Sequence, residues 1–238
     1  MTDSTRKTVI IAVDGPAASG KGTLAKSLAA KLGYAHLDTG AVYRTIALAA
    51  LKAGVDPADI DAVRPVLDAI KDKITLEMLN DPAIRTGAVA EAAAKVAALP
   101  EVRDAVRHFQ IDFANNPPNG APGAVLDGRD IGTVVCPNAD IKLYVTADAE
   151  ERARRRFLEL KTKNPAITQE QVLKDINDRD HADMSRAHSP LKAASDAHIL
   201  DTTKLDPAGS LEEAVKIVRS KVPPPTGEAP KNSRAPAP

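Results

Sequence analysis

The sequence is poor in cysteine and in aromatic residues. Cys136 is its single cysteine, so no disulfide can form within the chain. Tryptophan is absent, and three tyrosines and three phenylalanines are too few for a platform on which the bases of single-stranded nucleic acid stack. The five histidines have neither metal-ligand spacing nor a cysteine cluster beside them. We therefore expect no transition-metal site.

The chain also lacks an excess of charge of either sign. Lysines and arginines together number 32, as do aspartates and glutamates, whereas an extended nucleic-acid-binding surface usually needs a marked basic excess. The polar start MTDSTRK does not resemble a signal peptide, and no apolar run is long enough to span a bilayer. We expect a cytoplasmic monomer that binds small molecules and has no nucleic-acid or membrane partner.

Candidate strands alternate with helical stretches along the chain. The first strand, Thr8 to Val13, is a continuous apolar and β-branched run of the kind that is buried on both faces of a parallel sheet. Further candidates are AHL near His36, GAVLD ending at Asp127, IKLYVTA from Ile141 and AHILD ending at Asp201. This alternation predicts an α/β fold with an open parallel sheet, in which ligands bind beyond the carboxyl ends of the strands.

A chain of 238 residues can bury one sizeable core with small accessory lobes. We expect residues 1–52, 114–149 and 192–222 to form that core. An alanine-rich insertion, residues 53–113, is helical by pattern, although its segment KITLEML could form a short strand. A second, charged helical insertion covers residues 150–191. The proline-rich segment 223–238 has no means of forming a core, and we expect it to be disordered.

The stretch GPAASGKGT lies between the first strand and a helical pattern that ends at Leu32. It nearly matches G-x-x-x-x-G-K-[ST], but a glycine replaces the hydroxyl residue and the threonine follows one position later. Glycines let several backbone N–H groups converge on one phosphate, and the helix N-terminus adds a favourable dipole. An ordinary glycine-rich turn with a solvated lysine is the alternative. The residues of this candidate phosphate-binding loop, to which the family resemblance given below assigns the phosphates of ATP, are Gly15, Pro16, Ala17, Ala18, Ser19, Gly20, Lys21, Gly22 and Thr23.

The segment VLDGRDIGT ends another candidate strand. Asp127 can hold Mg²⁺, usually through water, because this hard cation prefers oxygen ligands. Thr23 is the second expected magnesium contact, so the expected cofactor is Mg²⁺ together with ATP. The alternative is that Asp127 only caps the next turn. Arg129 and Asp130 put opposite charges at the predicted ligand face, and we interpret them as substrate contacts.

The segment LDTGAVYR, residues 37–44, lies at a third strand-to-helix turn. Asp-Thr-Gly is also the active-site triplet of aspartic proteases, in which two carboxyl groups share one proton. Here the triplet occurs once, in an α/β pattern rather than a β-rich chain, which disfavours a protease. We expect this turn to open a helix whose Tyr43 and Arg44 face a second ligand.

The arginines indicate the type of reaction. A run such as ERARRRFLEL is often a solvated helical face, and that alternative applies to each of its arginines, Arg154 above all. As a set, planar guanidinium groups can bring two phosphate groups together against their repulsion. Phosphoryl transfer depends mainly on positioning and charge neutralisation, so the set favours this chemistry. Its members are Arg44, Arg103, Arg129, Arg152, Arg155, Arg156, Arg179 and Arg186.

Seven segments, in order, resemble those of bacterial cytidylate kinases. They are DGPAASGKGT, LDTGAVYR, VAALPEVR, LDGRDIGTVVCP, ERARRR, RDHADMSRAHSPL and DAHILDTT, and the resemblance covers residues 9–222. It implies the fold of a P-loop nucleoside monophosphate kinase, with a five-stranded parallel sheet, a monophosphate-binding lobe at 53–113 and a lid at 150–191. The implied reaction is transfer of phosphate from ATP to CMP or dCMP, with no side chain as an obligate general base.

The same resemblance implies roles for individual residues. Arg155 and Arg156 would belong to the lid with Arg152 and would contact ATP. The implied catalytic residues are Lys21, Arg129, Arg152, Arg155, Arg156 and Arg179. The residues implied around the monophosphate are Thr39, Tyr43, Arg44, Arg103, Arg129, Asp130, Arg179, Asp183 and Arg186, with Arg103 and Asp130 nearest the base.

Two features depart from the family pattern. Ala94 stands where the pattern often has a serine near the cytosine, which removes one possible hydrogen bond to the base. The first insertion also lacks an extra hairpin-like segment. A UMP or AMP kinase is therefore an alternative. A nucleotide-dependent switch is disfavoured because the chain has no N-K-x-D motif, and a DNA- or RNA-handling ATPase is disfavoured by the charge balance.

Overall fold

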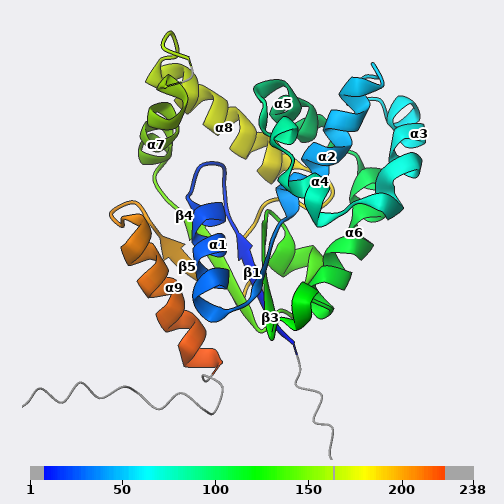
Figure 1. Cartoon of the computed structure of the whole chain (residues 1–238). Coiled ribbons are helices and arrows are strands. Elements are labelled where there is room, and N and C mark those ends of the chain that lie inside the picture. The colour runs from blue at the N-terminus through cyan, green and yellow to red at the C-terminus, as the bar shows by residue number, and fades with distance from the viewer. Residues whose placement is uncertain (1–7, 163, 223–238) are drawn as a thin grey trace, which may run out of the picture.

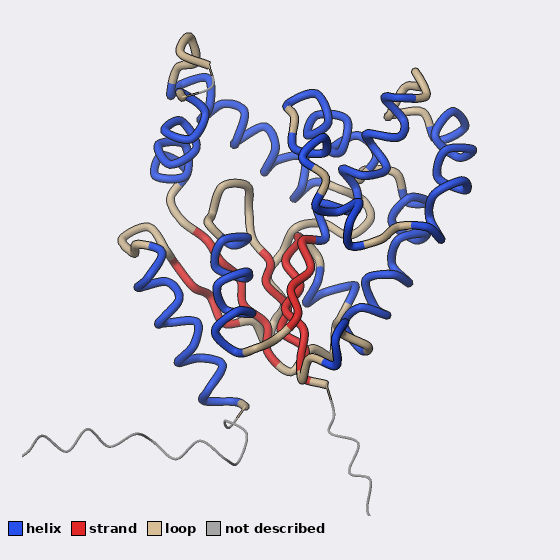
Figure 2. Tube along the Cα trace, viewed as in Figure 1, coloured by secondary structure: helices blue, strands red, loops and turns tan. Residues whose placement is uncertain are grey.

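A five-stranded parallel sheet forms the centre of the protein. The computed structural model describes residues 8–162 and 164–222. The strands, red in Figure 2, follow the order β2-β3-β1-β4-β5. All neighbouring pairs are parallel. Their bounds are β1 (Val9–Asp14), β2 (Ala35–Asp38), β3 (Gly123–Gly128), β4 (Ile141–Thr146) and β5 (His198–Asp201). The predicted α/β fold with a five-stranded parallel sheet is confirmed.

The register of the strands brings the sequence motifs to one edge of the sheet. Val13 of β1 is level with Asp127 of β3, and Asp127 is level with Asp38 of β2. The phosphate loop follows β1, the LDTG turn follows β2 and the GRD segment follows β3, so all three emerge from the same carboxyl edge. This is the edge at which parallel α/β sheets bind ligands.

Helices cover both faces of the sheet because the central strands are apolar on both sides. Ile11 and Val13 pack toward α1 (Lys21–Leu32) and α9 (Pro207–Lys221), in a cluster that also contains Leu28. Ala12 faces the opposite side, where it shares a cluster with residues of α2 (Thr39–Lys52) and α6 (Pro100–Asn115). Helix α1 ends at Gly33, whose positive φ of 68° allows the C-cap.

The first insertion consists of helices packed onto α2. Its elements between α2 and α6 are α3 (Ile60–Ile70), η1 (Lys71–Lys73), α4 (Leu76–Asn80), η2 (Pro82–Arg85) and α5 (Gly87–Val96). Val63, Leu79 and Val89 join the same hydrophobic cluster as the α2 side of the sheet. The insertion therefore continues the main core. Its assignment as a separate monophosphate-binding lobe stays a prediction.

The possible strand at KITLEML was wrong. These residues lead into α4, because the Thr75 hydroxyl accepts a hydrogen bond from the Met78 N–H and caps the helix start. Leu79 is buried against α2, while Leu76 stays partly exposed. A short local capping interaction has overridden the β-like pattern of the segment.

The second insertion forms a pair of helices, α7 (Ala149–Lys161) and α8 (Gln169–Ser185), which rise beyond the carboxyl ends of the strands opposite α4 and α5 (Figure 1). Ala153, Val172 and Ile176 give this pair its own small hydrophobic cluster.

The remaining elements are η3 (Pro118–Gly120) and η4 (Ile131–Val135). Within the described residues, no helix is both long and apolar enough to traverse a bilayer. The expected disorder of residues 223–238 falls outside the described residues.

Candidate active site

The phosphate loop between β1 and α1 leaves backbone N–H groups at the helix start without a side-chain cap. Gly15 has a φ of 152°, and a Cβ there would lie 2.0 Å from the Val145 carbonyl oxygen of β4, so only glycine fits. Ala18 and Gly20 also have positive φ values, 56° and 82°. These conformations turn the loop around the end of α1, as an anion site requires.

Lys21 begins helix α1 within this loop. Burial lowers the pKa of its ammonium to about 7, and the positive charges of Arg129 and Arg179 lower it further, whereas Asp127 acts in the opposite direction. Lys21 makes no ion pair with any described residue. A half-buried, unpaired cation beside two guanidinium groups is held there at an electrostatic cost that a bound anion would remove.

Asp127 is held from two sides at the end of β3. Its Oδ2 lies 2.8 Å from His36 Nε2, and its backbone carbonyl accepts a 2.7 Å hydrogen bond from the Thr39 hydroxyl. Its other carboxylate oxygen, Oδ1, faces the phosphate loop, 3.6 Å from where a Cβ of Gly22 would lie. A methyl group at residue 22 would already be in van der Waals contact with this oxygen, so glycine leaves that space free.

This donor set fits Mg²⁺. Mg²⁺ typically takes one or two carboxylates and fills its remaining positions with water and substrate phosphate oxygens. Asp127 offers the carboxylate, and Thr23, exposed at the start of α1, offers a hydroxyl. Among the described residues, no three His, Cys, Asp or Glu side chains are grouped so as to hold a metal ion. Contact through water, as the sequence predicts, is compatible with this arrangement.

A buried carboxylate connects the phosphate loop to the GRD segment. Asp14, the last residue of β1, accepts hydrogen bonds from the Ile131 N–H at 2.8 Å and the Gly132 N–H at 2.7 Å. Burial raises its pKa to about 6, even though these hydrogen bonds and Lys21 favour the ionised form. Asp14 thus fixes the start of η4, directly after Arg129 and Asp130.

The LDTG turn has a capped helix start. Asp38 accepts a hydrogen bond from the Ala41 N–H and pairs with Arg44 at 2.5 Å. Gly40 lets this pair form, since a Cβ there would lie 3.0 Å from Arg44 Nη1. The turn therefore orients the side chain of Arg44, a predicted monophosphate contact.

Tyr43, Arg103 and Asp130 lie together, as predicted. Arg103 Nη2 is 2.7 Å from Asp130 Oδ2, and both side chains are buried. The same guanidinium lies over the Tyr43 ring, 5.3 Å from its centroid, and donates to the Ala97 carbonyl. Burial raises the pKa of Tyr43. The aromatic ring and the carboxylate together hold the guanidinium group of Arg103 in one orientation.

A second cationic group surrounds Asp183 on α8. The carboxylate accepts a 2.7 Å hydrogen bond from Arg129 Nε and also pairs with Arg186. Arg179 lies one turn earlier; burial lowers its pKa to about 10, and the charges of Arg129, Arg44 and Arg186 add to this. Burial would raise the pKa of Asp183, but the neighbouring arginines hold it below its usual value. Three arginines, Arg129, Arg179 and Arg186, therefore act on the one carboxylate of Asp183.

The three arginines predicted for the lid lie in different surroundings. Arg152 is buried and bonded to Asp180 at 2.5 Å, to the Ala17 carbonyl at 2.9 Å and to the Ala147 carbonyl at 2.9 Å. Arg156 is on the exposed face of α7, paired with Glu159 at 2.9 Å. The structure does not bring these two side chains together; the contact of Arg156 with ATP and the catalytic role of Arg152 stay predictions.

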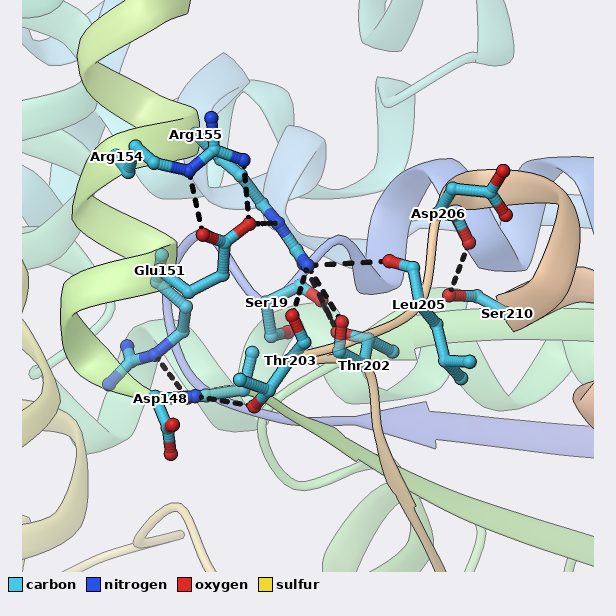
Figure 3. A network of polar contacts seen from close by, with 12 residues as sticks. Ser19, Asp148, Glu151, Arg154, Arg155, Thr202, Thr203, Leu205, Asp206 and Ser210 are labelled. Atoms are coloured by element: carbon cyan, nitrogen blue, oxygen red, sulfur yellow. Dashed lines mark hydrogen bonds and ion pairs between the residues drawn. The ribbon is translucent and has the colours of Figure 1, made fainter.

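Arg155 connects α7 to the loop after β5 (Figure 3). It pairs with Glu151 at 2.8 Å and donates to the Thr202 carbonyl at 2.7 Å, with longer contacts to the Thr203 and Leu205 carbonyls. The Thr202 hydroxyl in turn donates to the Ser19 carbonyl of the phosphate loop. Arg155 thus lies near the loop where ATP is expected. Arg154, assigned to a solvated face, pairs with Glu151 and is exposed.

Sequence reasoning missed Asp14, His36 and Asp180. Each contacts a predicted site residue or its neighbour across a large sequence separation, so no local pattern could reveal it. It also missed a cavity of about 550 Å³ between the start of α1, β2, α4 and η2, which reaches Asp127 and His36. Its rim carries Lys26 and Arg85, both exposed.

A phosphate loop after the central strand of a parallel sheet, facing a cluster of arginines on the helices that follow, defines the class as a P-loop kinase. The chain belongs to the cytidylate kinase family, because the family model described as "Cytidylate kinase" matches residues 11–220. The resemblance read from the seven segments is thereby confirmed.

Curated relatives named "Cytidylate kinase" match nearly the whole chain. The protein of Nitrobacter winogradskyi is 50% identical over 212 residues, which cover 89% of this chain and 96% of the relative. That of Rhodospirillum rubrum is 48% identical over 213 residues, covering 90% and 98%. A crystal structure of an uncharacterized protein from Eubacterium ventriosum, 14% identical, covers 90% of this chain and 99% of its own, with a TM-score of 0.52. That last likeness concerns the fold alone.

Proposed function

We propose that the protein transfers the γ-phosphoryl group of ATP to CMP or dCMP, giving ADP and CDP or dCDP. One observation carries this proposal: Lys21 of the phosphate loop is close enough to Arg129 and Arg179 for their charges to lower its pKa. Neither Lys21 nor Arg179 has an ion-pair partner among the described residues. Two phosphate-bearing ligands, one at each cationic group, would supply the missing negative charge.

The chemistry that follows is positioning and charge neutralisation. The N–H groups of the phosphate loop and Lys21 would hold the β- and γ-phosphates of ATP. Arg44, Arg129, Arg179 and Arg186 would hold the phosphate of the acceptor, and Asp183 keeps two of these arginines in place. When bound, Mg²⁺ neutralises charge on the transferred phosphoryl group. No side chain needs to remove a proton in a separate step.

Tyr43, Arg103 and Asp130 would recognise the base. Arg103 Nε is buried and has no hydrogen-bond partner among the described residues, which is costly unless an acceptor is bound. A cytosine offers acceptors at its carbonyl oxygen and ring nitrogen. Ala94 is exposed on α5 and cannot donate a hydrogen bond to the base. A UMP or AMP kinase is therefore the runner-up.

A coupled assay with ATP and Mg²⁺ tests the base assignment, with CMP, dCMP, UMP and AMP as acceptors at equal concentrations. We expect the highest kcat/KM with CMP or dCMP. Faster turnover of AMP than of either cytidine nucleotide would contradict the proposal. Phosphorylation of none of the four acceptors would contradict the reaction class as well.

Substituting Ala94 tests the departure from the family pattern. In Ala94→Ser, a hydroxyl near the base would restore one hydrogen bond, and we expect the preference for CMP over UMP to rise by about five- to tenfold, the value of roughly one net hydrogen bond. Ala98→Ser, at an exposed position just beyond α5, is the control and should leave the ratio unchanged. An unchanged ratio in both variants would place Ala94 away from the base.

We further propose that the protein works as a monomer in the cytoplasm, on nucleotides rather than nucleic acid. The balanced charge supports the last part of this proposal, because an extended nucleic-acid-binding surface usually needs a basic excess. Light scattering after gel filtration, in the presence of ATP and CMP, should give a mass near 25.1 kDa. A stable mass twice as large would exclude the monomer.

A further inference from the structure

Two side chains of the lid helices hold the backbone of a single residue of the phosphate loop, Ala17. Asp180 of α8 accepts a hydrogen bond from the Ala17 N–H at 3.0 Å, and Arg152 of α7 donates to the Ala17 carbonyl oxygen at 2.9 Å. The two side chains are themselves paired at 2.5 Å. We call this arrangement the Ala17 clasp, meaning Arg152, Asp180 and the backbone of Ala17.

The clasp is buried, and an apolar contact accompanies it. Arg152 and Asp180 are each only 7% exposed, so solvent cannot easily replace these bonds. The next residue, Ala18, packs against the hydrophobic cluster of the lid that contains Ala153 and Ile176. Ala18 adopts a positive φ of 56°, which is unfavourable for a residue other than glycine and therefore needs support from its surroundings. The lid helices supply that support.

The helix that supplies one arm of the clasp also carries acceptor-site residues. Arg179 immediately precedes Asp180, and Asp183, which pairs with Arg129, lies less than one turn later. Any movement of α8 that accompanies phosphate binding at Arg179 or Arg129 would also move Asp180 relative to Ala17. A single rigid helix thus connects the acceptor site to the shape of the phosphate loop.

We propose that Arg152 and Asp180 are positioning residues, which hold the phosphate loop in its anion-binding conformation and couple occupancy of the acceptor site to ATP binding. This assigns Arg152 to the backbone of the loop rather than to a phosphate, and it gives Asp180 a role in the reaction. The inference rests on the proposed function, because it takes CMP as the ligand of the acceptor site.

Calorimetry on the full chain tests the coupling. The Kd of CMP is measured without and with saturating ADP, and the Kd of ADP without and with CMP; the two ratios must agree because coupling is reciprocal. For the wild type we expect each ratio to be about fivefold or more, the lower end of common coupling. Failure of the wild type to bind CMP would refute the proposed function, whereas CMP binding with a ratio of 1 would refute only the coupling.

The variant is Arg152→Met combined with Asp180→Leu. Replacing both partners of a buried pair by apolar residues avoids a lone buried charge, so we expect the fold to persist in circular dichroism. ADP should bind about tenfold or more weakly, CMP alone should bind within about threefold of wild type, and the coupling ratio should fall close to 1. A folded variant that retains the wild-type ratio would overturn the proposal.

Two further variants separate positioning from general stability. Lys174→Gln with Asp178→Asn removes an exposed ion pair on the same helix and should leave both Kd values and the ratio unchanged. Arg152→Lys keeps a donor and the charge near Ala17, so it should recover part of the ADP affinity and of the ratio.

Steady-state kinetics give a second test of the double variant. We expect its KM for ATP to rise, while its KM for CMP, measured at low ATP, stays near wild type; this result would support the clasp. An equal loss for both substrates would contradict it.

Discussion

Replacing Asp14 by asparagine tests how the carboxylate behind the phosphate loop is held. Both of its oxygens accept backbone N–H groups from the start of η4, and the side chain is only 5% exposed. Burial outweighs these hydrogen bonds and raises its pKa from 3.8 to about 6. Asparagine stays neutral throughout the pH range and therefore lacks this titration.

The direction in which stability changes with pH follows from which state of the protein binds the proton of Asp14 more tightly. Because the pKa of Asp14 is higher in the folded than in the unfolded state, the folded state binds the proton more tightly. The group therefore favours folding most below a pH of about 4, and this contribution is lost as the pH rises to about 6. A shift of roughly two pKa units corresponds to about 3 kcal/mol in the free energy of unfolding.

Urea unfolding followed by far-ultraviolet circular dichroism measures this difference, for wild type and Asp14→Asn between a pH of about 4 and 7.5. The free energy of unfolding of the wild type, minus that of the variant, should fall by about 3 kcal/mol between a pH of about 4 and 6 and then stay constant. Subtracting the variant cancels the titration of all other groups, to the extent that they are independent of Asp14.

The exposed Asp201 provides a control with the opposite sign. Hydrogen bonds from Thr203 hold the pKa of Asp201 below its ordinary value, so its contribution to stability is present above that value and is lost as the pH falls. The corresponding difference curve for Asp201→Asn, extended to a pH of about 2.5, should therefore rise as the pH approaches the ordinary value of 3.8 and stay flat above it. A difference curve for Asp14 that is flat, or that also rises, would refute the argument that burial dominates at this site.

Three further predictions concern the reaction. Lys21→Ala should lower kcat by on the order of 10²- to 10³-fold with an unchanged circular dichroism spectrum, while Lys31→Ala at the other end of α1 should have wild-type activity; near-wild-type rates for Lys21→Ala would exclude its role. His36→Leu removes the hydrogen bond to Asp127 Oδ2, so calorimetric titration of Mg²⁺ into the ADP complex should show about tenfold weaker binding. His36→Gln should bind Mg²⁺ with an affinity closer to wild type. Equal Mg²⁺ affinity in all three proteins would contradict this prediction. Residues 150–191 should exchange amide hydrogens more slowly with ATP analogue and CMP bound than without them, and equal protection would argue against a closing lid.

The elements and the motif-bearing residues could be predicted from the sequence because their signals are local. The phosphate loop follows a buried strand directly, and Asp127 and Arg129 lie within three residues of each other at a strand end. The order of the strands in the sheet could not be predicted from such local signals. It is the pairing of β1 with β3 that places Asp127 level with Val13, although the two are far apart in the chain.

Residues that act through another residue could not be predicted for the same reason. Asp180 contacts Ala17 over a separation of 163 residues, and His36 contacts Asp127 over 91. Neither sits in a recognisable motif of its own. The arginine run in α7 shows that neighbours in one motif can also differ. Arg154, Arg155 and Arg156 have similar sequence contexts. The helical turn nevertheless directs Arg155 inward and leaves the other two side chains more exposed.

The order of strands in the sheet has a consequence for synthesis of the chain. Strand β1 lies at the centre of the sheet and is made first, but its two neighbours, β3 and β4, begin only at residues 123 and 141. At a ribosomal rate of about 5–20 residues per second, the apolar segment around Ile11 waits on the order of 5–20 s for its first partner strand. During that time it is a natural target for chaperones, and conditions that slow translation before residue 123 should favour aggregation of the nascent chain.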